Sequence, residues 1–542
     1  MSQARLMQEQ SIKDHGPQYV GGVRSEHYPL GSPGHFGYRC EWLLDVYHDG
    51  SFRWFSAWSN GYATGQLDAL KSGGCGDTPL PGQCELLLAN PINIASGIKY
   101  QQDSDIADQS GGLSLTRFFI GDNVDRPAAI FGEVWRSNYD RHIVLWDSIG
   151  IQTAVIYRPD GKGLYFNKMD DNWRADSDVQ FKLTQLGPSG SISGWDLTDP
   201  HDTHEIYDAN GRLQQIVFKD RRKLVLEYTI GGQLMRVTDR HGRRLSFSYN
   251  AEGRLSAVID PASQRFEYGY AAGGVLTEVR YPDGHVKTYK YNENDYVAAA
   301  GSPGSYLTGI EEDGSRYASF YYDAQGRARI STHANAIDRV EFSYLDENTV
   351  RVTDSLGAVS TRSLQLGNGY KRFVGASALS SIDGNRAAAI SYDARGYPDG
   401  FRDFSGNMRD SDYDARGLMS RQTEAANDST GSKRSILTSW HPNFRVPVEK
   451  VIHDANDSLL SRYTWTYNAR GQALTSSRTD PVAGTTRITT TTYCEQTEID
   501  AGTCPLSGLT TSVDGPRSDL SDLLRYTYYA TDDASCAATP TT

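Results

Sequence analysis

The segment HDTHE at residues 201–205 gathers two histidines and a glutamate, which are side chains that bind zinc. His201, His204 and Glu205 stand in the order His-x-x-His-Glu. A zinc hydrolase helix uses His-Glu-x-x-His, because that spacing places two histidines and a general base on one helix face. The segment also comes just before a predicted strand. We therefore interpret it as a polar loop rather than a metal site.

The segment MDDNWRADSD at residues 169–178 gathers hard oxygen ligands of the kind that hold calcium. They are Asp170, Asp171, Asn172, Asp176 and Asp178. The calcium-hand loop also needs a glycine turn and a terminal glutamate, and neither is present. A solvated acidic loop is the interpretation that this pattern favours.

Motifs for nucleophilic catalysis and phosphate binding are absent from the sequence. It has no Gly-x-Ser-x-Gly elbow and no phosphate loop. Aspartate, serine and histidine are scattered through turns, and no catalytic triad stands out. We predict a protein that is not an enzyme, with no catalytic, cofactor-binding or metal-binding residue and no cofactor.

The six cysteines cluster near the two ends of the chain. No Cys-x-x-Cys pair occurs, which argues against a zinc site. Cys494 and Cys504 bracket a ten-residue step that contains Gly502, and this spacing suits a hairpin closed by a disulfide. Reduced, half-buried thiols are the alternative, because the compartment is unknown. The other cysteines are Cys40, Cys75, Cys84 and Cys536.

Composition narrows the class of protein. The chain has 542 residues, with 53 glycines and 33 tyrosines, and this balance favours turns and strands. Its formal net charge of −13 argues against nucleic-acid binding, which needs a basic surface. No apolar run is long enough to span a membrane, and the first residues, MSQARLMQEQSIKDHG, do not form a signal peptide.

One short phrase recurs: Tyr, then Asp or Asn, then Ala, any residue, and Gly. It is spaced by 21 residues over its first copies, and looser copies at Tyr228, Tyr270 and Tyr291 fill the gaps. A fixed period of this length indicates a stacked array of one small unit. The six full copies start at Tyr207, Tyr249, Tyr322, Tyr392, Tyr413 and Tyr467.

Each unit contains two strands and two turns. Counted from the tyrosine, position four is glycine, which a tight hairpin turn requires, and positions six and nine are apolar. These two positions have opposite parity, so the first strand carries a bulge or packs on both sides. The returning strand alternates, as in Leu245, Phe247 and Tyr249. A hairpin buries its apolar face only by pairing with neighbours.

We therefore predict an all-β fold with one long antiparallel sheet of stacked hairpins that curls into an open or partial shell. A propeller is the alternative, since two units match the size of one blade, but neighbouring units look alike. After residue 311 the spacing loosens, which we interpret as insertions or bends in the same sheet.

Four regions follow from these patterns. Residues 1–89 form an irregular and β-containing region, in which DGSFRWFSAWSNG predicts one strand between two turns. Residues 90–200 predict a β-rich domain, with strands at LSLTRFFI, HIVLWD and TAVIYRP and a hairpin turn at DGKG. The repeat array covers 201–535, and 536–542 is a truncated tail.

A basic ladder is predicted along one rim of the array. Lys223, Arg244 and Arg265 occupy position sixteen of successive units, and position fifteen adds Arg222, Arg243 and His285. Equivalent turns lie two strand spacings apart, about 9–10 Å. The ladder could meet an anionic glycan, an acidic partner or an acidic cargo. Alternatively, these charges only keep turns soluble and sheet edges unpaired.

The phrases YDANGRL, YNAEGRL, YDAQGRA and YNARGQAL resemble the YD repeats of the RHS family, which the teneurin shell shares. The resemblance covers roughly residues 207–535. NPINIASGIKYQQDSD (90–105), LSLTRFF (113–119) and FGEVWRSNYD (131–140) are similar to the uncharacterised domain that commonly precedes such repeats. Residues 492–529 resemble a stretch inside bacterial members.

This resemblance implies a bacterial protein with a hollow β shell around a cargo, in many members a toxin at the chain's own C-terminus. The sequence lacks the family's Asp-Pro motif followed by Gly-Leu, because Asp480-Pro481 leads into VAG. We therefore expect a fragment or a truncated gene.

We expect a non-enzymatic scaffold, the shell segment of a contact-dependent or polymorphic toxin-delivery or cell-surface protein. By resemblance it would be secreted or lie at the cell surface, with a toxin cargo or a secretion-apparatus component as partner. The alternative is an extracellular carbohydrate-binding or adhesion module, in which tyrosine and tryptophan side chains stack on sugars. An enzyme with an undetected site is the third alternative.

Overall fold

The computed structural model describes most of the chain from residue 86 onward and three strands before it. The described ranges are 23–29, 36–44, 53–57, 86–107, 112–122, 126–132, 134–148, 151–188, 191–298, 306–379, 387–517, 519 and 521–529. The first sixteen residues, most of the irregular N-terminal region and three cysteines (Cys75, Cys84 and Cys536) lie outside these ranges.

The chain divides into two compact units. The first comprises Met1–Lys71 with Asn123–Asp125. Its described part is an antiparallel sheet of β1 (Val23–Pro29), β2 (Phe36–Leu44) and β3 (Arg53–Ala57). β3 is the strand predicted within DGSFRWFSAWSNG, and Cys40 lies on β2.

The second unit, Ser72–Asp122 with Arg126–Thr542, begins with two small sheets. Together they form what we call the N-terminal domain, residues 86–175. The Asp160–Gly163 turn joins two of its strands, as DGKG predicted, with Gly161 at a φ of 86°. The first sheet contains β4 (Leu87–Leu88), β5 (Ile92–Asn93), β6 (Ile98–Ile106), β7 (Leu115–Ile120) and β8 (Trp135–Ser137). The second contains β9 (His142–Ser148), β10 (Ile151–Tyr157), β11 (Gly163–Met169) and β12 (Asn172–Ala175).

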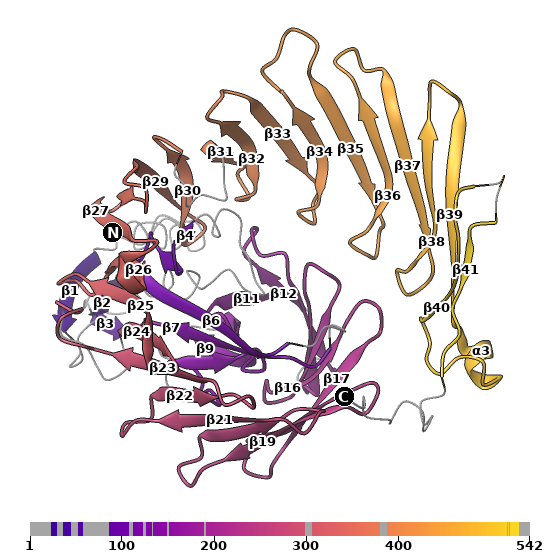
Figure 1. Ribbon diagram of the computed structural model, residues 1–542. Helices are drawn as coiled ribbons and strands as arrows, with labels where there is room; N and C mark the ends of the chain where they lie inside the picture. The colour runs from indigo at the N-terminus through magenta and orange to yellow at the C-terminus, as the bar shows by residue number, and fades with distance from the viewer. Residues whose placement is uncertain are drawn as a thin grey trace. The chain divides into compact units, whose positions relative to one another are not determined.

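The rest of the second unit is one antiparallel sheet of 29 strands that follow one another in chain order (Figure 1). The prediction of an all-β chain with one long continuous sheet, rather than separate blades, is confirmed. Among the described residues, its end strands do not pair with each other. The sheet begins at Lys182, ahead of residue 201 where the repeat phrase placed the start of the array.

The first half of this sheet contains β13 (Lys182–Leu186), β14 (Gly194–Thr198), β15 (His204–Asp208), β16 (Leu213–Val217), β17 (Lys223–Tyr228), β18 (Leu234–Asp239), β19 (Arg244–Tyr249), β20 (Leu255–Ile259), β21 (Arg265–Tyr270), β22 (Leu276–Arg280), β23 (Val286–Tyr291), β24 (Leu307–Glu312), β25 (Ser315–Tyr322) and β26 (Ala328–His333). A short 3₁₀ turn, η2 (Ala334–Ala336), follows β26, in the part of the array where the spacing loosens.

The second half contains β27 (Val340–Asp346), β28 (Thr349–Thr353), β29 (Val359–Gly367), β30 (Tyr370–Ala376), β31 (Ala387–Tyr392), β32 (Pro398–Asp403), β33 (Met408–Tyr413), β34 (Met419–Glu424), β35 (Arg434–Trp440), β36 (Pro447–His453), β37 (Leu459–Tyr467), β38 (Ala473–Asp480), β39 (Thr485–Tyr493), β40 (Thr510–Asp514) and β41 (Leu523–Arg525).

The repeated phrase forms the hairpin turn of each unit. In the first copy, the Asp208 N–H donates to the Arg212 carbonyl (2.9 Å) and the Gly211 N–H donates to the Asp208 carbonyl (3.0 Å). The Asp208 carboxylate also accepts the N–H groups of Asn210 (2.9 Å) and Arg212 (3.0 Å). Aspartate or asparagine is favoured here because its short side chain caps the turn. Gly253 has a φ of 78°, so its predicted positive φ is confirmed.

The tyrosine of the phrase fastens most units to the one before it, whereas in the first copy the Tyr207 hydroxyl donates to Glu205. The Tyr249 hydroxyl donates to the Leu234 carbonyl (2.8 Å), the atom fifteen residues earlier that opens β18. Tyr228, Tyr270, Tyr291 and Tyr322 repeat this bond at the same separation of fifteen residues. Trp440 stands in place of a tyrosine and donates its indole N–H to the Met419 carbonyl (2.9 Å). The tyrosines thus lie in register in one sheet, as the period predicts.

A bulge in the first strand of each unit resolves the parity problem. Tyr228 pairs with Leu234 while Glu227 pairs with Arg236, so Met235 is the extra residue of β18. The same shift recurs in the equivalent hairpins. Because one residue is added, Leu234 and Val237 both point into the core, where they are 3% and 0% exposed. The predicted bulge is confirmed.

Burial in the sheet declines toward the C-terminal strands. One hydrophobic core cluster joins the N-terminal domain to the repeats, and its last member in sequence is Ile390. None of the side chains of β39 is buried, and all three of β41 are exposed. The late strands are therefore held by backbone pairing and by the tyrosine bonds more than by apolar burial.

The segment between Cys494 and Cys504 differs from the expectation. These cysteines form a disulfide, but a short helix, α3 (Gln496–Asp500), lies between them instead of a hairpin. A capping box explains the helix, since the Glu495 and Glu498 side chains each accept the other's backbone N–H.

Candidate functional site

The N-terminal domain binds the repeats through their hairpin turns. The Ile143 N–H donates to the Gly211 carbonyl at 2.9 Å, and the Leu255 N–H donates to the Ile130 carbonyl at 3.1 Å. Further along, the Ala328 N–H donates to the Gly97 carbonyl at 2.8 Å. The repeat partners lie in or just after phrase turns. These turns therefore close the hairpins of the repeats and also bind the N-terminal domain.

A buried cluster centred on Arg117 fixes the same contact. The guanidinium binds the Asp105 carboxylate through two bonds, of 2.6 and 2.9 Å, and donates to the Tyr289 hydroxyl at 2.9 Å. The hydroxyls of Tyr268 and Tyr281 also donate to Asp105, each at 3.0 Å. Bidentate pairing of this kind is strong because both charges lie out of water. Three tyrosines of the repeats thus share one carboxylate environment of the N-terminal domain.

Asp103 completes this cluster. Its carboxylate accepts the Tyr289 hydroxyl and lies 3.4 Å from the Lys287 ammonium and 3.8 Å from Arg117. Burial alone would raise the pKa of Asp103, but Arg117 and Lys287 hold it below its ordinary value. Two carboxylates therefore face two cations. This pairing of opposite charges ties the N-terminal domain to the repeats.

Glu205 forms a second buried cluster, which overturns the polar-loop interpretation of its segment. His204 and Glu205 open strand β15, and Glu205 is 1% exposed. Its carboxylate binds Arg141 and Arg158, with bonds of 2.6 and 2.9 Å to Arg158, and accepts the Tyr207 hydroxyl. Although burial raises the pKa of Glu205, the two arginines lower it to about 2. For Glu205 the interpretation was wrong, because both arginines come from the N-terminal domain. His201 lies in an exposed turn, as the interpretation has it.

His204 lies on the opposite side of the strand and binds elsewhere. Its Nδ1 is 2.9 Å from the Asp196 carboxylate on the neighbouring strand β14. This hydrogen bond raises the pKa of His204. His204 and Glu205 of HDTHE therefore point to opposite faces of β15.

Late hairpins of the sheet bind its beginning through a group of contacts that we call the seam. The seam joins residues 177–202 to the hairpin loops at 395–397, 416–417 and 441–446. Arg445 donates to the side-chain and backbone oxygens of Gln180, at 3.1 and 2.8 Å, and its backbone N–H donates to Asp202 at 2.8 Å. The Tyr397 hydroxyl donates to the Ser177 carbonyl at 2.8 Å. These partners stand 220–265 residues apart in sequence.

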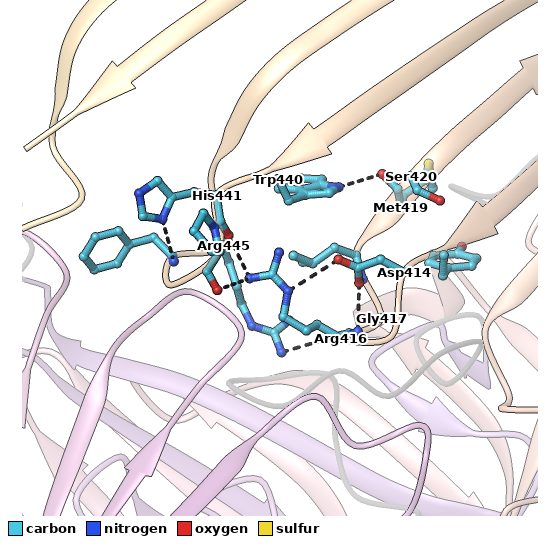
Figure 2. A network of polar contacts seen from close by, with 12 residues as sticks. Asp414, Arg416, Gly417, Met419, Ser420, Trp440, His441 and Arg445 are labelled. Atoms are coloured by element: carbon cyan, nitrogen blue, oxygen red, sulfur yellow. Dashed lines mark hydrogen bonds and ion pairs between the residues drawn. The ribbon is translucent and has the colours of Figure 1, made fainter.

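Figure 2 shows how the late side of the seam is organised around two arginines. Arg416 donates to the carbonyls of His441 (2.8 Å) and Pro442 (3.1 Å) in the next hairpin loop. Arg445 of that loop approaches the Arg416 carbonyl at 3.4 Å. Gly417 has a φ of 75°, and a Cβ there would overlap the Tyr397 hydroxyl. The loops at 416–417 and 441–446 therefore bind each other as well as residues 177–202.

The acidic segment at 169–178 contributes to the seam and is not a solvated loop throughout. Asn172–Ala175 forms strand β12, and Asp178 is 1% exposed. Burial, together with the negative charge of Asp178, raises the pKa of the Tyr370 phenol. The expectation holds for Asp170 and Asp171, whose side chains are exposed, and is wrong for Asp178.

The structure positions the basic ladder at equivalent places. Lys223, Arg244 and Arg265 are the first residues of β17, β19 and β21, and all three are exposed. Arg265 pairs with Glu267 at 2.8 Å. The position-fifteen residues are paired as well, Arg222 with Asp220, Arg243 with Asp239 and His285 with Asp313. Ligand binding by the ladder stays a prediction.

Metal and membrane sites were also sought in the described ranges. No group of three or more His, Cys, Asp or Glu side chains gathers there as metal ligands would. None of the helices described has the length and apolar character that crossing a bilayer needs.

Sequence reasoning missed Asp103, Asp105 and Arg117 of the first buried cluster and the arginines Arg141 and Arg158 of the second. Asp103, Asp105 and Arg117 sit in QQDSD and LTRFF, which otherwise read as ordinary alternating strands. Arg117 interrupts the apolar run of β7, whose other five residues are four apolar side chains and one threonine. A charge inside a buried strand was the available signal, because it requires a partner.

Comparison with protein families gives two matches within the chain. Residues 89–166 match the domain of unknown function DUF6531, and residues 231–265 match the RHS repeat. The chain therefore contains a DUF6531 domain followed by RHS repeats. No curated protein sequence matches the chain.

Solved structures give distant likenesses. The crystal structure of TcdB2-TccC3-TEV is 10% identical, with a TM-score of 0.32, and the match covers 97% of this chain and 32% of that one. The crystal structure of TcdB2-TccC3-Cdc42 is 11% identical, with a TM-score of 0.31 and coverages of 96% and 28%. A porin-like protein from Bacteroides uniformis is 9% identical, with a TM-score of 0.14 and coverages of 52% and 96%. The chain spans about a third of the length of the first two proteins.

Proposed function

We propose that this chain is a non-enzymatic scaffold, the shell segment of an RHS-type toxin-delivery protein that holds a polypeptide guest. The seam is the observation that supports this proposal most. A long sheet retains a guest only if its distant repeats are held together, and the seam ties repeats near residues 395–446 to residues 177–202. The N-terminal domain adds a second tie, because it binds turns from Gly211 to Ala328.

Export from the cytoplasm belongs to the same proposal. The Cys494–Cys504 disulfide supports it, because disulfides persist in oxidising compartments such as the periplasm or the cell exterior. A guest toxin or a component of the secretion apparatus would be the partner.

Guest protection tests the proposal. A small, protease-sensitive reporter domain is fused after Thr542, and its digestion is followed over time against the free reporter. We expect slower digestion in the fusion. Arg445→Ala removes the seam bonds to Gln180 and should restore fast digestion. Arg462→Ala is the matched control, since Arg462 is an exposed arginine whose ion pair among the described residues is with Glu449 at the surface. Equal digestion of free and fused reporter contradicts the carrier role.

A panel of peptide, nucleic-acid and glycoside substrates tests the non-enzymatic part separately. We expect no turnover. Reproducible turnover that a single Asp, His or Ser substitution abolishes would overturn this part of the proposal.

A further inference from the structure

The late repeats replace core positions with polar and aromatic side chains. Counted from the tyrosine of the phrase, Tyr463 and Trp465 occupy the positions that Leu224 and Leu226 hold in an early unit, where both leucines are 3% exposed. In the late unit the two aromatic side chains are half-buried. They are stacked, with ring centroids 6.2 Å apart and planes inclined by 13°.

Cations take further core positions of the same units. Lys450 lies three residues after Pro447, whose carbonyl accepts the Tyr467 hydroxyl as Leu255 accepts that of Tyr270. Lys450 therefore takes the position of Val258 in the early unit. The Val258 side chain is 0% exposed. A sheet face meant for a permanent apolar core would not substitute lysine for valine, because a buried lysine is costly.

Strand register places these side chains in one row. Lys450 pairs with Tyr463, Tyr463 pairs with Arg478, and Arg478 pairs with Arg487. Directly paired residues of neighbouring strands point to the same face of a sheet. The row crosses four strands, β36 to β39, and spans about 15 Å. We call Lys450, Tyr463, Trp465, Arg478 and Arg487 the cationic strip.

The charges of the strip are available for a ligand. Arg478 and Arg487 are exposed, and within the described ranges neither they nor Lys450 form an ion pair. Arg478 lies over the Tyr463 ring at 5.6 Å. On the opposite face of β37, by contrast, Arg462 is neutralised by Glu449 at 2.6 Å. The two faces of the sheet at β36 to β39 therefore differ in free charge.

The chain itself shows what binds this face in the early repeats. Lys287 and Tyr289 hold in the Tyr291 unit the positions of Tyr463 and Trp465. Tyr281 holds in the preceding Tyr270 unit the position of Arg478. There, the side chains bind Asp103 and Asp105, carboxylates from the polypeptide that covers the sheet. The established interface is thus a face of phenols and cations against acidic polypeptide, and the strip continues that face.

We propose that the cationic strip binds an acidic, extended segment of a polypeptide partner, with aspartate or glutamate carboxylates on Arg478, Arg487 and Lys450. This inference rests on the proposed function, since the segment would belong to the carried guest. Charge complementarity and continuity with the Asp103–Asp105 interface favour polypeptide. Nucleic acid fits less well, because the protein carries a net charge of −13 and three cations neutralise few phosphates.

Binding of labelled peptides to the full chain tests the proposal. The probe is a fluorescein-labelled oligoglutamate of about six residues, which spans about 20 Å when extended and so covers the strip. Oligoglutamine of the same length is the neutral control, and fluorescence anisotropy gives the Kd. We expect binding of oligoglutamate only, weakened about tenfold or more by the double change Arg478→Ser and Arg487→Ser.

Arg462→Ser is the matched control, because it removes one arginine from the same sheet on the other face. It should change the Kd by less than about twofold. Trp465→Ala should also weaken binding, because an aromatic side chain supports the extended peptide. The proposal is overturned if oligoglutamate does not bind, if oligoglutamine binds with the same Kd, or if the double variant binds oligoglutamate as the wild type does. It is also overturned if single-stranded DNA displaces the labelled peptide at a lower concentration than unlabelled oligoglutamate.

Failure of this inference is distinguishable from failure of the carrier role. The reporter assay depends on Arg445 at the seam, whereas peptide binding depends on Arg478 and Arg487 in the strip. Protected reporter with no peptide binding overturns only the strip. Peptide binding that the strip variants abolish, together with an unprotected reporter, overturns only the carrier role.

Discussion

Two glycines with the same backbone conformation make a controlled test of how the N-terminal domain docks on the repeats. Gly211 and Gly253 hold position four of their units, and each has a φ of 78°. They differ in what a Cβ would meet. At Gly253 the nearest atom is the Gln233 side-chain nitrogen at 3.4 Å, whereas at Gly211 a Cβ would overlap the Ile143 carbonyl. The substitutions are Gly211→Ala and Gly253→Ala.

The shared conformation costs both variants about 1–2 kcal/mol, because an L-residue is strained at positive φ. Gly211→Ala has a further cost. The Ile143 carbonyl belongs to the backbone and cannot rotate away, so the 2.9 Å bond from the Ile143 N–H to the Gly211 carbonyl must open. Ile143 is 2% exposed, and an unsatisfied buried amide costs about 1–3 kcal/mol. We therefore expect Gly211→Ala to cost about 1–3 kcal/mol more than Gly253→Ala.

Native-state hydrogen exchange on the full chain measures this difference locally, since a repeat array need not unfold in one step. In Gly211→Ala, amides of residues 142–148 and 211–217 should exchange about 5-fold to 150-fold faster than in Gly253→Ala. Gly253→Ala should affect residues 249–259 and leave 142–148 unchanged. Equal exchange at 142–148 in the two variants would refute docking through the Gly211 turn.

Four further predictions concern other parts of the chain. Glu205→Gln should lower the free energy of unfolding by about 3–5 kcal/mol, because it leaves two buried arginines without a counter-charge. Glu227→Gln, which breaks a half-exposed ion pair, should lower it by about 0–1 kcal/mol. Urea denaturation of the two variants measures both changes. The Glu205 pKa of about 2 in the folded protein lies below its ordinary 4.5, so the stabilisation from this carboxylate is full above about pH 4.5 and is lost as pH falls toward 2. Across this pH window the melting temperature of the wild type should therefore fall more steeply than that of Glu205→Gln. Parallel profiles of melting temperature against pH would count against the ion pairs. Tyr249→Phe removes the hydroxyl bond to Leu234 and should cost about 1 kcal/mol, measured by exchange of the β18 amides, with no change expected if the bond does not tie the units together. The basic ladder of Lys223, Arg244 and Arg265 should bind an acidic polysaccharide, with an affinity that falls steeply as salt is added. Changing all three residues to serine should abolish this binding. Binding that is insensitive to salt, or unchanged in the triple variant, would mean that these charges only protect the sheet edge.

Features that depend on neighbouring residues were readable in the sequence. The Asp208–Arg212 turn needs only a short acceptor side chain and a glycine four residues after the tyrosine, and both stand in the phrase. The parity of Leu234 and Val237 indicated the bulge that the register shows. The close spacing of Cys494 and Cys504 made their disulfide a candidate, although it did not reveal that a helix with its own capping box lies between them.

Features that depend on distant partners were decided by the tertiary structure. Glu205 appeared as a loop residue because its arginine Arg158 lies 47 positions away. Asp178 appeared solvated because Tyr370, whose phenol it influences, lies on β30, far along the chain. Sequence period also shows only that a strand has two faces. Which face the N-terminal domain covers, and where that cover gives way to the cationic strip, follow from long-range packing, since the free energy of burying a side chain depends on what approaches it from elsewhere in the chain.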